Sequence, residues 1–201
     1  MIVVAAEQYN TPLLQAIAQF MQIDERFHFP GHGGVLSDDL FCLLGENTFR
    51  ADLTELPGLD DLNNPHGVIQ KAQELAAKAF GVKHTFFLVN GSTIGLQTLV
   101  LAYCAPGDKI LLPRNLHRSL LGGLILSGAQ PVFLKPDIVP DFQFPAGVSP
   151  KTVAQGVAFC PEAKAMMIIH PNYYGVYGKT AWQVRIAAVS YTHLDVYKRQ
   201  R

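Results

Sequence analysis

Short uncharged runs alternate with amphipathic stretches in the second half of the chain, and these runs are rich in β-branched, aromatic and aliphatic residues. Such runs are typical of strands buried on both faces of a sheet. We expect strands at residues 85–89, 110–112, 132–134 and 165–169. Apolar residues at helical spacing follow them, and helices are expected at residues 94–102, 120–128 and 150–160. This alternation predicts an α/β fold with a mostly parallel sheet, flanking helices and right-handed crossovers.

The first clear helical pattern covers residues 9–24. Thr11 is expected to cap this helix, and Pro12 suits its first turn. The apolar stripe of residues 13–21 is either core or a contact surface for a second subunit. No chemistry is assigned to it.

A second helix is expected after Pro65 and Gly67, and it should end at Gly81. The side chains expected to face inward are Ile69, Ala72, Leu75, Ala76, Ala79 and Phe80. The preceding stretch, residues 52–62, is acidic and apolar with a Pro-Gly turn, which indicates a loop crossing the face of the domain.

Three segments each follow directly on an expected strand: residues 91–93, 114–119 and 170–175. In a parallel α/β sheet, ligands bind at the carboxyl ends of the strands. We therefore expect these segments to line one rim of the sheet and to form the binding site.

Residues 90–93, Asn-Gly-Ser-Thr, lie between an expected strand and the helix after it. A tight glycine turn there leaves backbone N–H groups pointing out of the helix N-terminus. Those groups, two hydroxyls and the helix dipole can hold a phosphate. The alternative is an ordinary turn in which Ser92 only caps the helix.

Residues 27–34, Phe-His-Phe-Pro-Gly-His-Gly-Gly, form a glycine-rich loop with two histidines. Three glycines in four positions predict positive φ angles or a very close backbone approach. The two histidines could suggest a metal. Pro30 and the glycines exclude one helical face, however, and no carboxylate or thiol is near. No metal site is predicted.

The chain has 201 residues, of which 49% are hydrophobic and 16% charged, with 16 basic and 16 acidic side chains. This balance argues against a positive face for nucleic acid. The widely spaced cysteines, Cys42, Cys104 and Cys160, indicate buried thiols in a reduced compartment. No apolar run approaches the roughly 20 residues of a membrane helix, and no basic secretory n-region is present. We expect a soluble, cytoplasmic protein.

Several motifs, in this order, resemble those of the Orn/Lys/Arg decarboxylase family, pyridoxal-phosphate (PLP) enzymes of the aspartate-aminotransferase fold. They are FPGHGG (29–34), DLTELPGLDDL (52–62), FFLVNGST (86–93), PGD (106–108), RNLHRS (114–119), SGAQPV (127–132) and PNYYGV (171–176). The resemblance implies an incomplete aspartate-aminotransferase-like (fold type I) large domain. The domains expected are an N-terminal helical segment (1–26) and a partial PLP-binding domain (27–187). Residues 188–201 resemble a non-native, adaptor-like tail.

The resemblance also implies roles for individual residues. Gly91, Ser92 and Thr93 match the loop that holds the cofactor phosphate. His117 matches the histidine that stacks on the pyridine ring, whereas on its own it would be read as a local helix cap. The weaker candidates for substrate or cofactor contacts are Ser119, Tyr173 and Tyr174. Asn172 stands where many relatives have threonine.

The Schiff-base lysine and the aspartate beneath the pyridinium nitrogen, which the family's chemistry needs, have no counterpart in a matching context. We therefore expect the N-terminal fragment of a larger enzyme, inactive as given. The whole enzyme would decarboxylate arginine, lysine or ornithine to a polyamine-type amine and CO2, as a homo-oligomer. The alternatives are another PLP enzyme of the fold, such as an aminotransferase or lyase, and a non-catalytic phosphate-binding α/β module.

Overall fold

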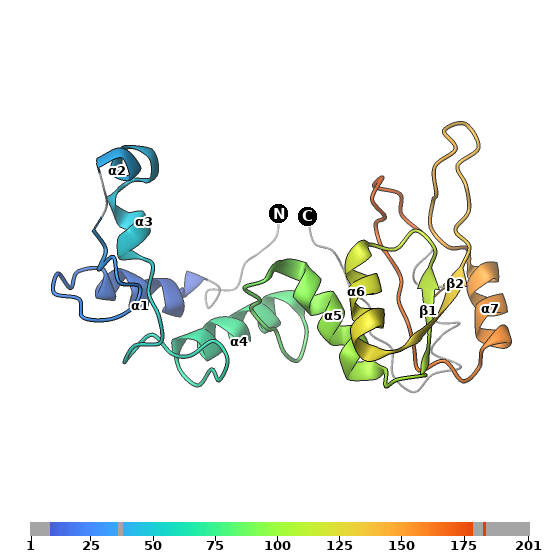
Figure 1. Ribbon diagram of the computed structural model, residues 1–201, viewed down its shortest axis with the longest axis horizontal. Helices are drawn as coiled ribbons and strands as arrows, with labels where there is room; N and C mark the ends of the chain where they lie inside the picture. Colours follow the sequence, from blue (N-terminus) through green and yellow to red (C-terminus); the bar gives the residue numbers. More distant parts are fainter. Residues whose placement is uncertain (1–8, 36–37, 179–182, 184–201) are drawn as a thin grey trace. The chain divides into compact units, whose positions relative to one another are not determined.

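The computed structural model describes residues 9–35, 38–178 and 183 (Figure 1). The chain divides into two compact units, Met1–Phe87 and Leu88–Arg201. The expected domain boundary at residue 26 stays a prediction. The boundary at residue 187 and the adaptor-like tail lie outside the described residues.

The described part of the first unit is helical. Its helices are α1 (Pro12–Phe20), α2 (Asp38–Leu44), α3 (Glu46–Arg50) and α4 (Val68–Phe80). Helix α1 is shorter than the expected 9–24, and the expected cap by Thr11 is wrong because its side chain makes no capping hydrogen bond. Proline fits the first turn, since a missing N–H costs nothing there. No side chain of α1 is buried.

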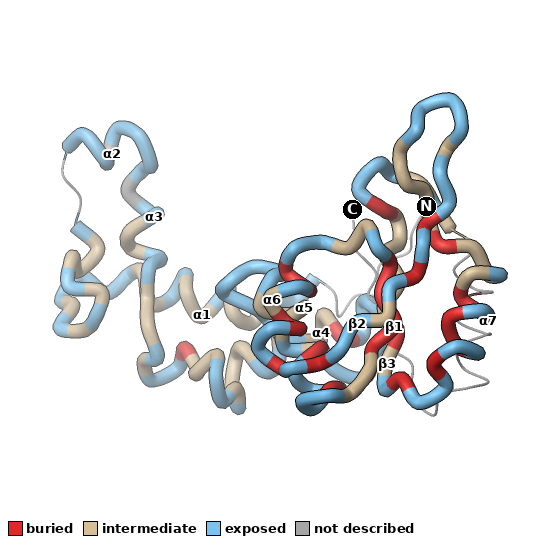
Figure 2. The backbone as a smooth tube through the Cα atoms, turned by 45° about the vertical axis from the view of Figure 1, so that its right-hand side comes forward, coloured by how far each residue is buried: buried red, intermediate tan, exposed pale blue. Residues whose placement is uncertain are grey.

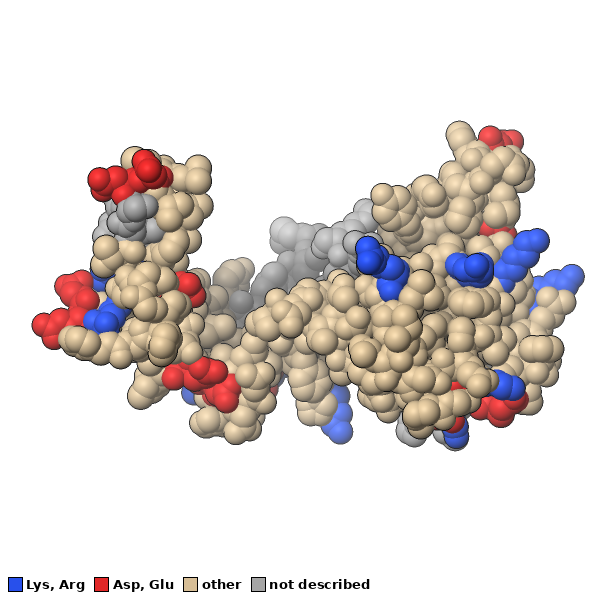
Figure 3. Space-filling view, viewed as in Figure 1, with Lys and Arg blue, Asp and Glu red and all other residues tan. Residues whose placement is uncertain are grey.

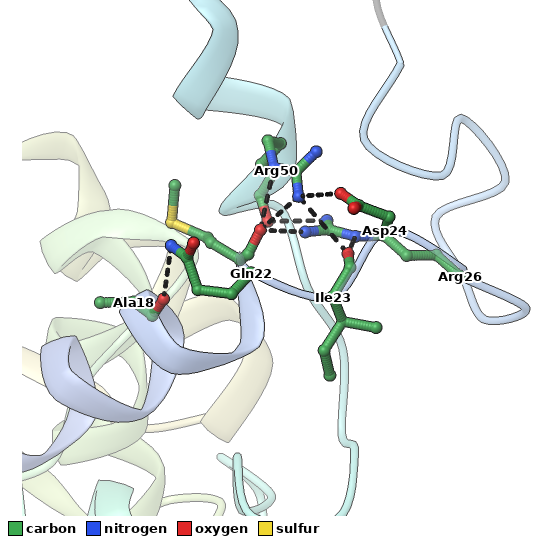
Figure 4. A network of polar contacts seen from close by, with 7 residues as sticks. Ala18, Gln22, Ile23, Asp24, Arg26 and Arg50 are labelled. Atoms are coloured by element: carbon green, nitrogen blue, oxygen red, sulfur yellow. Dashed lines mark hydrogen bonds and ion pairs between the residues drawn. The ribbon is translucent and has the colours of Figure 1, made fainter.

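Two arginines hold the C-terminal end of α1 (Figure 4). The last carbonyls of a helix lack partners within it. The Met21 carbonyl accepts from Nε of Arg50 at 2.9 Å and from Nη2 of Arg26 at 3.1 Å. Asp24 sits 3.0 Å from Nη2 of Arg50. Burial lowers the pKa of Arg26, and the charge of Arg50 lowers it further, against the opposing effect of Asp24.

The glycine-rich loop meets the expectation at two of its three glycines. Gly33 and Gly34 have φ angles of +58° and +81°. A Cβ at Gly34 would lie 2.9 Å from Nη1 of Arg26, so the backbone does come very close to a side chain there. Gly31 has neither a positive φ nor a neighbour within 4 Å. The loop therefore packs against the arginine that holds the end of α1.

Helix α4 begins after Gly67 and ends at Gly81, in the left-handed conformation, as predicted. Its inward face is smaller than expected. Ala77 is the buried residue of the helix, whereas Ala79 and Phe80, expected to be inward, are exposed. The apolar pattern therefore predicts more burial in the last turn of α4 than the structure shows.

The N-terminus of α4 is capped from a distance. Gly67, the residue at the cap position, has no side chain to offer, and the carboxylate of Asp60 takes its place. Its oxygens accept from the backbone N–H groups of Asp61, His66, Gly67, Ile69 and Gln70. The expected loop of residues 52–62 therefore ends in a structural anchor for the following helix.

The second unit is the α/β part of the chain. It contains α5 (Gly91–Tyr103), β1 (Lys109–Pro113), α6 (Arg118–Ser127), β2 (Gln130–Leu134), α7 (Pro150–Phe159) and β3 (Ala165–Met166). The strands lie in the order β2-β1-β3, and both pairings are parallel. The predicted parallel α/β arrangement is confirmed.

Side-chain alternation on β1 explains the layers. Leu111 packs into a cluster with α7, while Ile110 and Leu112 pack into a second cluster with α5 and α6. Figure 1 shows α6 and α7 on opposite sides of the sheet, and Figure 2 shows the buried residues gathered along these elements. A central strand covered on both faces has the uncharged pattern that the sequence shows.

The expected strand at residues 85–89 is wrong. The residues are outside any strand, and Phe86 and Val89 are 75% and 79% exposed. The run spans the boundary between the two units at Phe87. A strand needs a hydrogen-bonding neighbour, and none of the described strands pairs with these residues. Strand β3 is also shorter than the expected 165–169.

Among the described residues, no helix has the length and apolar character to cross a membrane. The expectation of three buried thiols holds for two. Burial raises the pKa of the Cys104 and Cys160 thiols, whereas Cys42 is exposed. On the face seen in Figure 3, basic and acidic side chains stand scattered among uncharged ones.

Candidate functional site

A cavity lies at the carboxyl end of the sheet in the second unit. It contains about 650 Å³ of empty space, part of it open solvent. Its walls come from the first turns of α5, from the start of α6 and from the segment after β3. The lining residues are Ser92, Leu96, His117, Leu120, Met167, Ile168, Ile169, His170 and Pro171. Parts of all three predicted rim segments therefore meet at one cavity.

Helix α5 begins at Gly91, whose φ is +65°. The preceding Asn90 makes no side-chain capping bond, and Ser92 lies inside the first turn rather than at the cap position. The expected cap by Ser92 is therefore wrong. A helix start without a side-chain cap presents its first N–H groups as donors, with the positive end of the dipole behind them. This arrangement suits an anion.

His117 is the cap residue of α6. Its Nδ1 accepts a hydrogen bond from the backbone N–H of Ser119 at 3.2 Å. The local capping role considered from the sequence is thus present. The same histidine also lines the cavity, together with Ser92. The two roles are compatible, because the cap uses only one ring nitrogen.

Ser119 is 5% exposed and is not among the residues that line the cavity. Its hydroxyl oxygen lies 2.9 Å from the hydroxyl of Thr93 and 2.8 Å from Nδ1 of His117. The structure therefore brings together four of the predicted residues: Ser92 and His117 on the cavity wall, with Thr93 and Ser119 linked to them by sequence or hydrogen bonds. Gly91 adjoins Ser92 at the helix start.

The structure does not bring Tyr173 and Tyr174 into the cavity wall. Tyr173 is 87% exposed and Tyr174 is 54% exposed. The ring of Tyr174 packs against Phe144, with the ring centroids 4.5 Å apart, and Tyr173 packs edge-on against Tyr174. The predicted contacts of both tyrosines with substrate or cofactor stay a prediction.

Asn172 organises this loop. Its amide nitrogen donates to the Pro145 carbonyl at 2.8 Å, and its Oδ1 accepts from the backbone N–H groups of Tyr174 and Val176, each at 3.0 Å. The residue is 6% exposed. A threonine has no donor and acceptor so far apart, so asparagine at this position serves the backbone rather than a hydroxyl chemistry.

His170 begins the predicted rim segment of residues 170–175, but the sequence analysis assigned it no role of its own. It lines the cavity and packs edge-on against Tyr177, with ring centroids 5.1 Å apart. Its position directly after the apolar run of residues 165–169 is the signal that could have identified it, because side chains there lie at the carboxyl end of a strand.

Among the described residues, no group of three or more His, Cys, Asp or Glu side chains could hold a metal ion. In the glycine-rich loop, Nε2 of His32 lies 3.3 Å from the Asp52 carboxylate, and the Gly34 N–H donates to Nδ1 at 3.0 Å. Both ring nitrogens of His32 therefore have protein partners.

The fold and the cavity together define an α/β domain with a cavity at the carboxyl edge of a parallel sheet, beside a helix N-terminus. Comparison with known proteins gives the family. Residues 11–196 match the model of the Orn/Lys/Arg decarboxylase family, major domain. The chain therefore belongs to that family, as the motifs indicated.

Curated relatives agree with this assignment. The chain is 39% identical over 171 residues to an arginine decarboxylase of Bacillus anthracis, in an alignment covering 84% of the chain and 35% of the relative. It is 33% identical over 135 residues to a lysine decarboxylase of Pseudomonas aeruginosa, covering 63% of the chain and 18% of the relative. The chain thus spans about a third or less of the length of these relatives.

A solved structure confirms the fold class. Lysine decarboxylase A from Pseudomonas aeruginosa superposes with a TM-score of 0.74 at 26% identity, over 94% of this chain and 28% of that one. The fold is therefore an incomplete form of the α/β large domain found in this family, as predicted.

Proposed function

We propose that this chain forms part of a PLP-dependent decarboxylase that releases CO2 from arginine, lysine or ornithine. Membership of the Orn/Lys/Arg decarboxylase family supports the reaction class. The observation that carries the proposal is the cavity in which Ser92, on the first turn of α5, and His117, at the start of α6, stand together.

The residues present fit the cofactor. A phosphate needs hydrogen-bond donors and positive potential, which the hydroxyl of Ser92 and the first N–H groups of α5 supply. A Cβ at Gly91 would meet nothing within 4 Å, so the approach to these groups is open.

The other cavity residues have complementary tasks in this proposal. The imidazole of His117 is a flat surface for an aromatic ring, and Leu96 and Leu120 provide apolar walls that exclude water. When bound, PLP supplies an electron-withdrawing ring that takes up the electrons left by the departing carboxylate. The chain's own residues hold and orient that ring.

No lysine lines the cavity among the described residues. The proposal therefore includes reversible, non-covalent binding of PLP by this chain, with no decarboxylation. Covalent attachment and turnover require a lysine and an aspartate in contexts that this sequence does not contain.

The experiment is a titration of the chain with PLP, followed by borohydride reduction and mass spectrometry. Replacing Ser92 by alanine should weaken PLP binding at least tenfold, since a hydrogen bond to a charged group contributes roughly 1.5–3 kcal/mol. Thr98→Ala, an exposed hydroxyl on the same helix, is the matched control. Equal affinities for all three chains would refute the phosphate site.

Decarboxylation of the substrate is measured separately from PLP binding. Release of CO2 from carboxyl-labelled arginine, lysine and ornithine is expected to stay at the background rate with this chain. Site-specific reduction onto one lysine, with CO2 release from any of the three, would contradict the expected inactivity while supporting the reaction class.

The proposal extends to the setting of the enzyme: a homo-oligomer in the cytoplasm, with a basic amino acid as its small-molecule partner and no nucleic acid or membrane partner. Thiols outside disulfides at Cys104 and Cys160 support a reduced compartment. The apolar face of α1, with Leu14 62% exposed and no residue buried, supports a partner-facing surface. Sedimentation analysis and oxidant titration test the two points separately.

A further inference from the structure

Three side chains from two helix starts form a continuous hydrogen-bonded row. Oγ1 of Thr93, in the first turn of α5, lies 2.9 Å from Oγ of Ser119. The same Oγ lies 2.8 Å from Nδ1 of His117, at the start of α6. Ser119 is 5% exposed, so water competes little for these bonds.

The direction of each bond follows from the backbone. The N–H of Ser119 donates to Nδ1 of His117 at 3.2 Å, so this nitrogen presents its lone pair and carries no proton. A nitrogen without a proton can only accept, so the Ser119 hydroxyl is inferred to donate to it and to share its one lone pair with the backbone N–H. The Ser119 oxygen then accepts the hydroxyl hydrogen of Thr93. Neutral His117 accordingly carries its proton on Nε2.

We propose that Ser119 is a positioning residue: it fixes His117 in the Nε2–H tautomer and ties its ring to the first turn of α5. The effect of this positioning on cofactor binding rests on the proposed function. Ser119 does not touch the cavity. It acts through His117 and Thr93, which differs from the direct substrate or cofactor contact expected from the sequence.

The hydrogen bonds of Ser119 hold in place two groups that a single ligand would touch. Thr93 belongs to the turn that offers donors to a phosphate, and His117 offers its ring to an aromatic ligand. A buried hydroxyl between them holds both before the ligand arrives, which lowers the entropy that binding must otherwise remove. The Nε2–H and the ring faces of His117 are left outside the row.

The parent chain tests the tautomer directly. Nitrogen-15 NMR of the imidazoles distinguishes Nε2–H from Nδ1–H, and the His117→Gln variant identifies the His117 signals among those of the seven histidines. The expected result is the Nε2–H form for neutral His117. A dominant Nδ1–H form would overturn the proposal without any further variant.

Ser119→Ala removes the hydroxyl and keeps the backbone N–H. The ratio of Nε2–H to Nδ1–H should then fall about fivefold, the factor for one net hydrogen bond. Ser119→Thr, which keeps a hydroxyl, should restore the ratio. Ser127→Ala is the matched control, because Ser127 lies on the same helix and is also 5% exposed. An unchanged ratio in Ser119→Ala, or an equal shift in Ser127→Ala, would refute the role of Ser119.

A PLP titration of the same chains separates this inference from the proposed function. Ser119→Ala should weaken PLP binding about fivefold relative to Ser127→Ala, since one hydrogen bond that preorganises the site is lost. If the parent chain itself fails to bind PLP, the proposed function falls, and the tautomer ratios still decide whether Ser119 positions His117.

Discussion

Replacing Asp60 by asparagine should destabilise the first unit, because this carboxylate caps α4 from outside the helix. Its side chain is 1% exposed. Oδ1 accepts two backbone N–H bonds and Oδ2 accepts three, at 2.8 to 3.3 Å. The donors are Asp61 and His66 for Oδ1, and Gly67, Ile69 and Gln70 for Oδ2.

An asparagine keeps one acceptor oxygen and puts an NH2 group where the other oxygen was. It therefore loses at least two bonds and sets its NH2 group against at least two backbone N–H donors. Hydrogen bonds to a charged group contribute roughly 1.5–3 kcal/mol each. The imidazole of His66 is exposed, so solvent screens part of this edge. We expect a loss of about 2–4 kcal/mol, at or above the upper end of the range for an ordinary helix cap, about 2 kcal/mol, because several bonds are lost together.

The pH dependence has a definite sign. Burial raises the pKa of Asp60, but the backbone hydrogen bonds outweigh burial and leave the pKa well below its usual value. An acid with a lowered pKa in the folded state contributes its full stability above the unfolded pKa, about 3.9. The contribution is lost as the pH falls from there towards the folded pKa. The difference between parent and variant should therefore be constant from about pH 5 to 7 and shrink below about pH 4.

Urea unfolding followed by circular dichroism measures this difference, and amide exchange in the first turn of α4 shows where it acts. Asp61→Asn is the matched control, since it removes the same charge one residue away and affects a single exposed bond, to the Asn63 N–H. We expect that control to cost less than about 1 kcal/mol. Equal effects of the two variants, or a difference that persists unchanged below pH 3, would refute the cap.

Two further substitutions test packing and loop order in the second unit. Gly123→Ala should lower the free energy of unfolding by about 1–3 kcal/mol, measured with urea, because its Cβ would lie 3.1 Å from the side chain of Val100 on α5. Gly122→Ala is the control and should be nearly neutral, because its Cβ would meet the movable end of the Gln97 side chain. Asn172→Ala should cost up to about 3 kcal/mol and speed amide exchange in the loop after β3, since three hydrogen bonds are lost. A Gly122 effect as large as that of Gly123, or unchanged exchange in the Asn172 variant, would contradict these readings.

Much of the second unit could be predicted from the sequence, because the burial and capping of its strands and helices are visible in their own local sequence patterns. The run of β1 is uncharged and is buried on both faces, and α7 begins at Ser149-Pro150 with the serine side chain as its cap. Parallel order then places the segments after the strands at one rim. This rule accounts for His117, which follows β1, and for His170, which follows β3. Ser92 follows none of the described strands, so its place in the cavity wall does not depend on the rule that predicted it.

The bonds that connect distant residues could not be predicted in this way. Asp60, whose φ is +72°, caps a helix that begins eight positions later. Ser119 joins Thr93 across 26 positions. The pattern of hydrophobic and polar residues along the sequence does not reveal such a bond, because each partner looks like an ordinary polar residue of a turn. These contacts depend on how the elements pack.

The failed strand at residues 85–89 shows the opposite limit of pattern reasoning. Its composition resembles that of β1, yet Phe86 and Val89 are exposed while Leu111 is fully buried. An uncharged run indicates that its side chains favour burial. A buried strand also needs a neighbouring strand for its hydrogen bonds and a layer of side chains over each face, and the run itself provides neither. In the described part of the chain β1 has both, with β2 and β3 beside it and helices over each face. Residues 85–89 pair with none of the described strands, so their apolar side chains stay exposed.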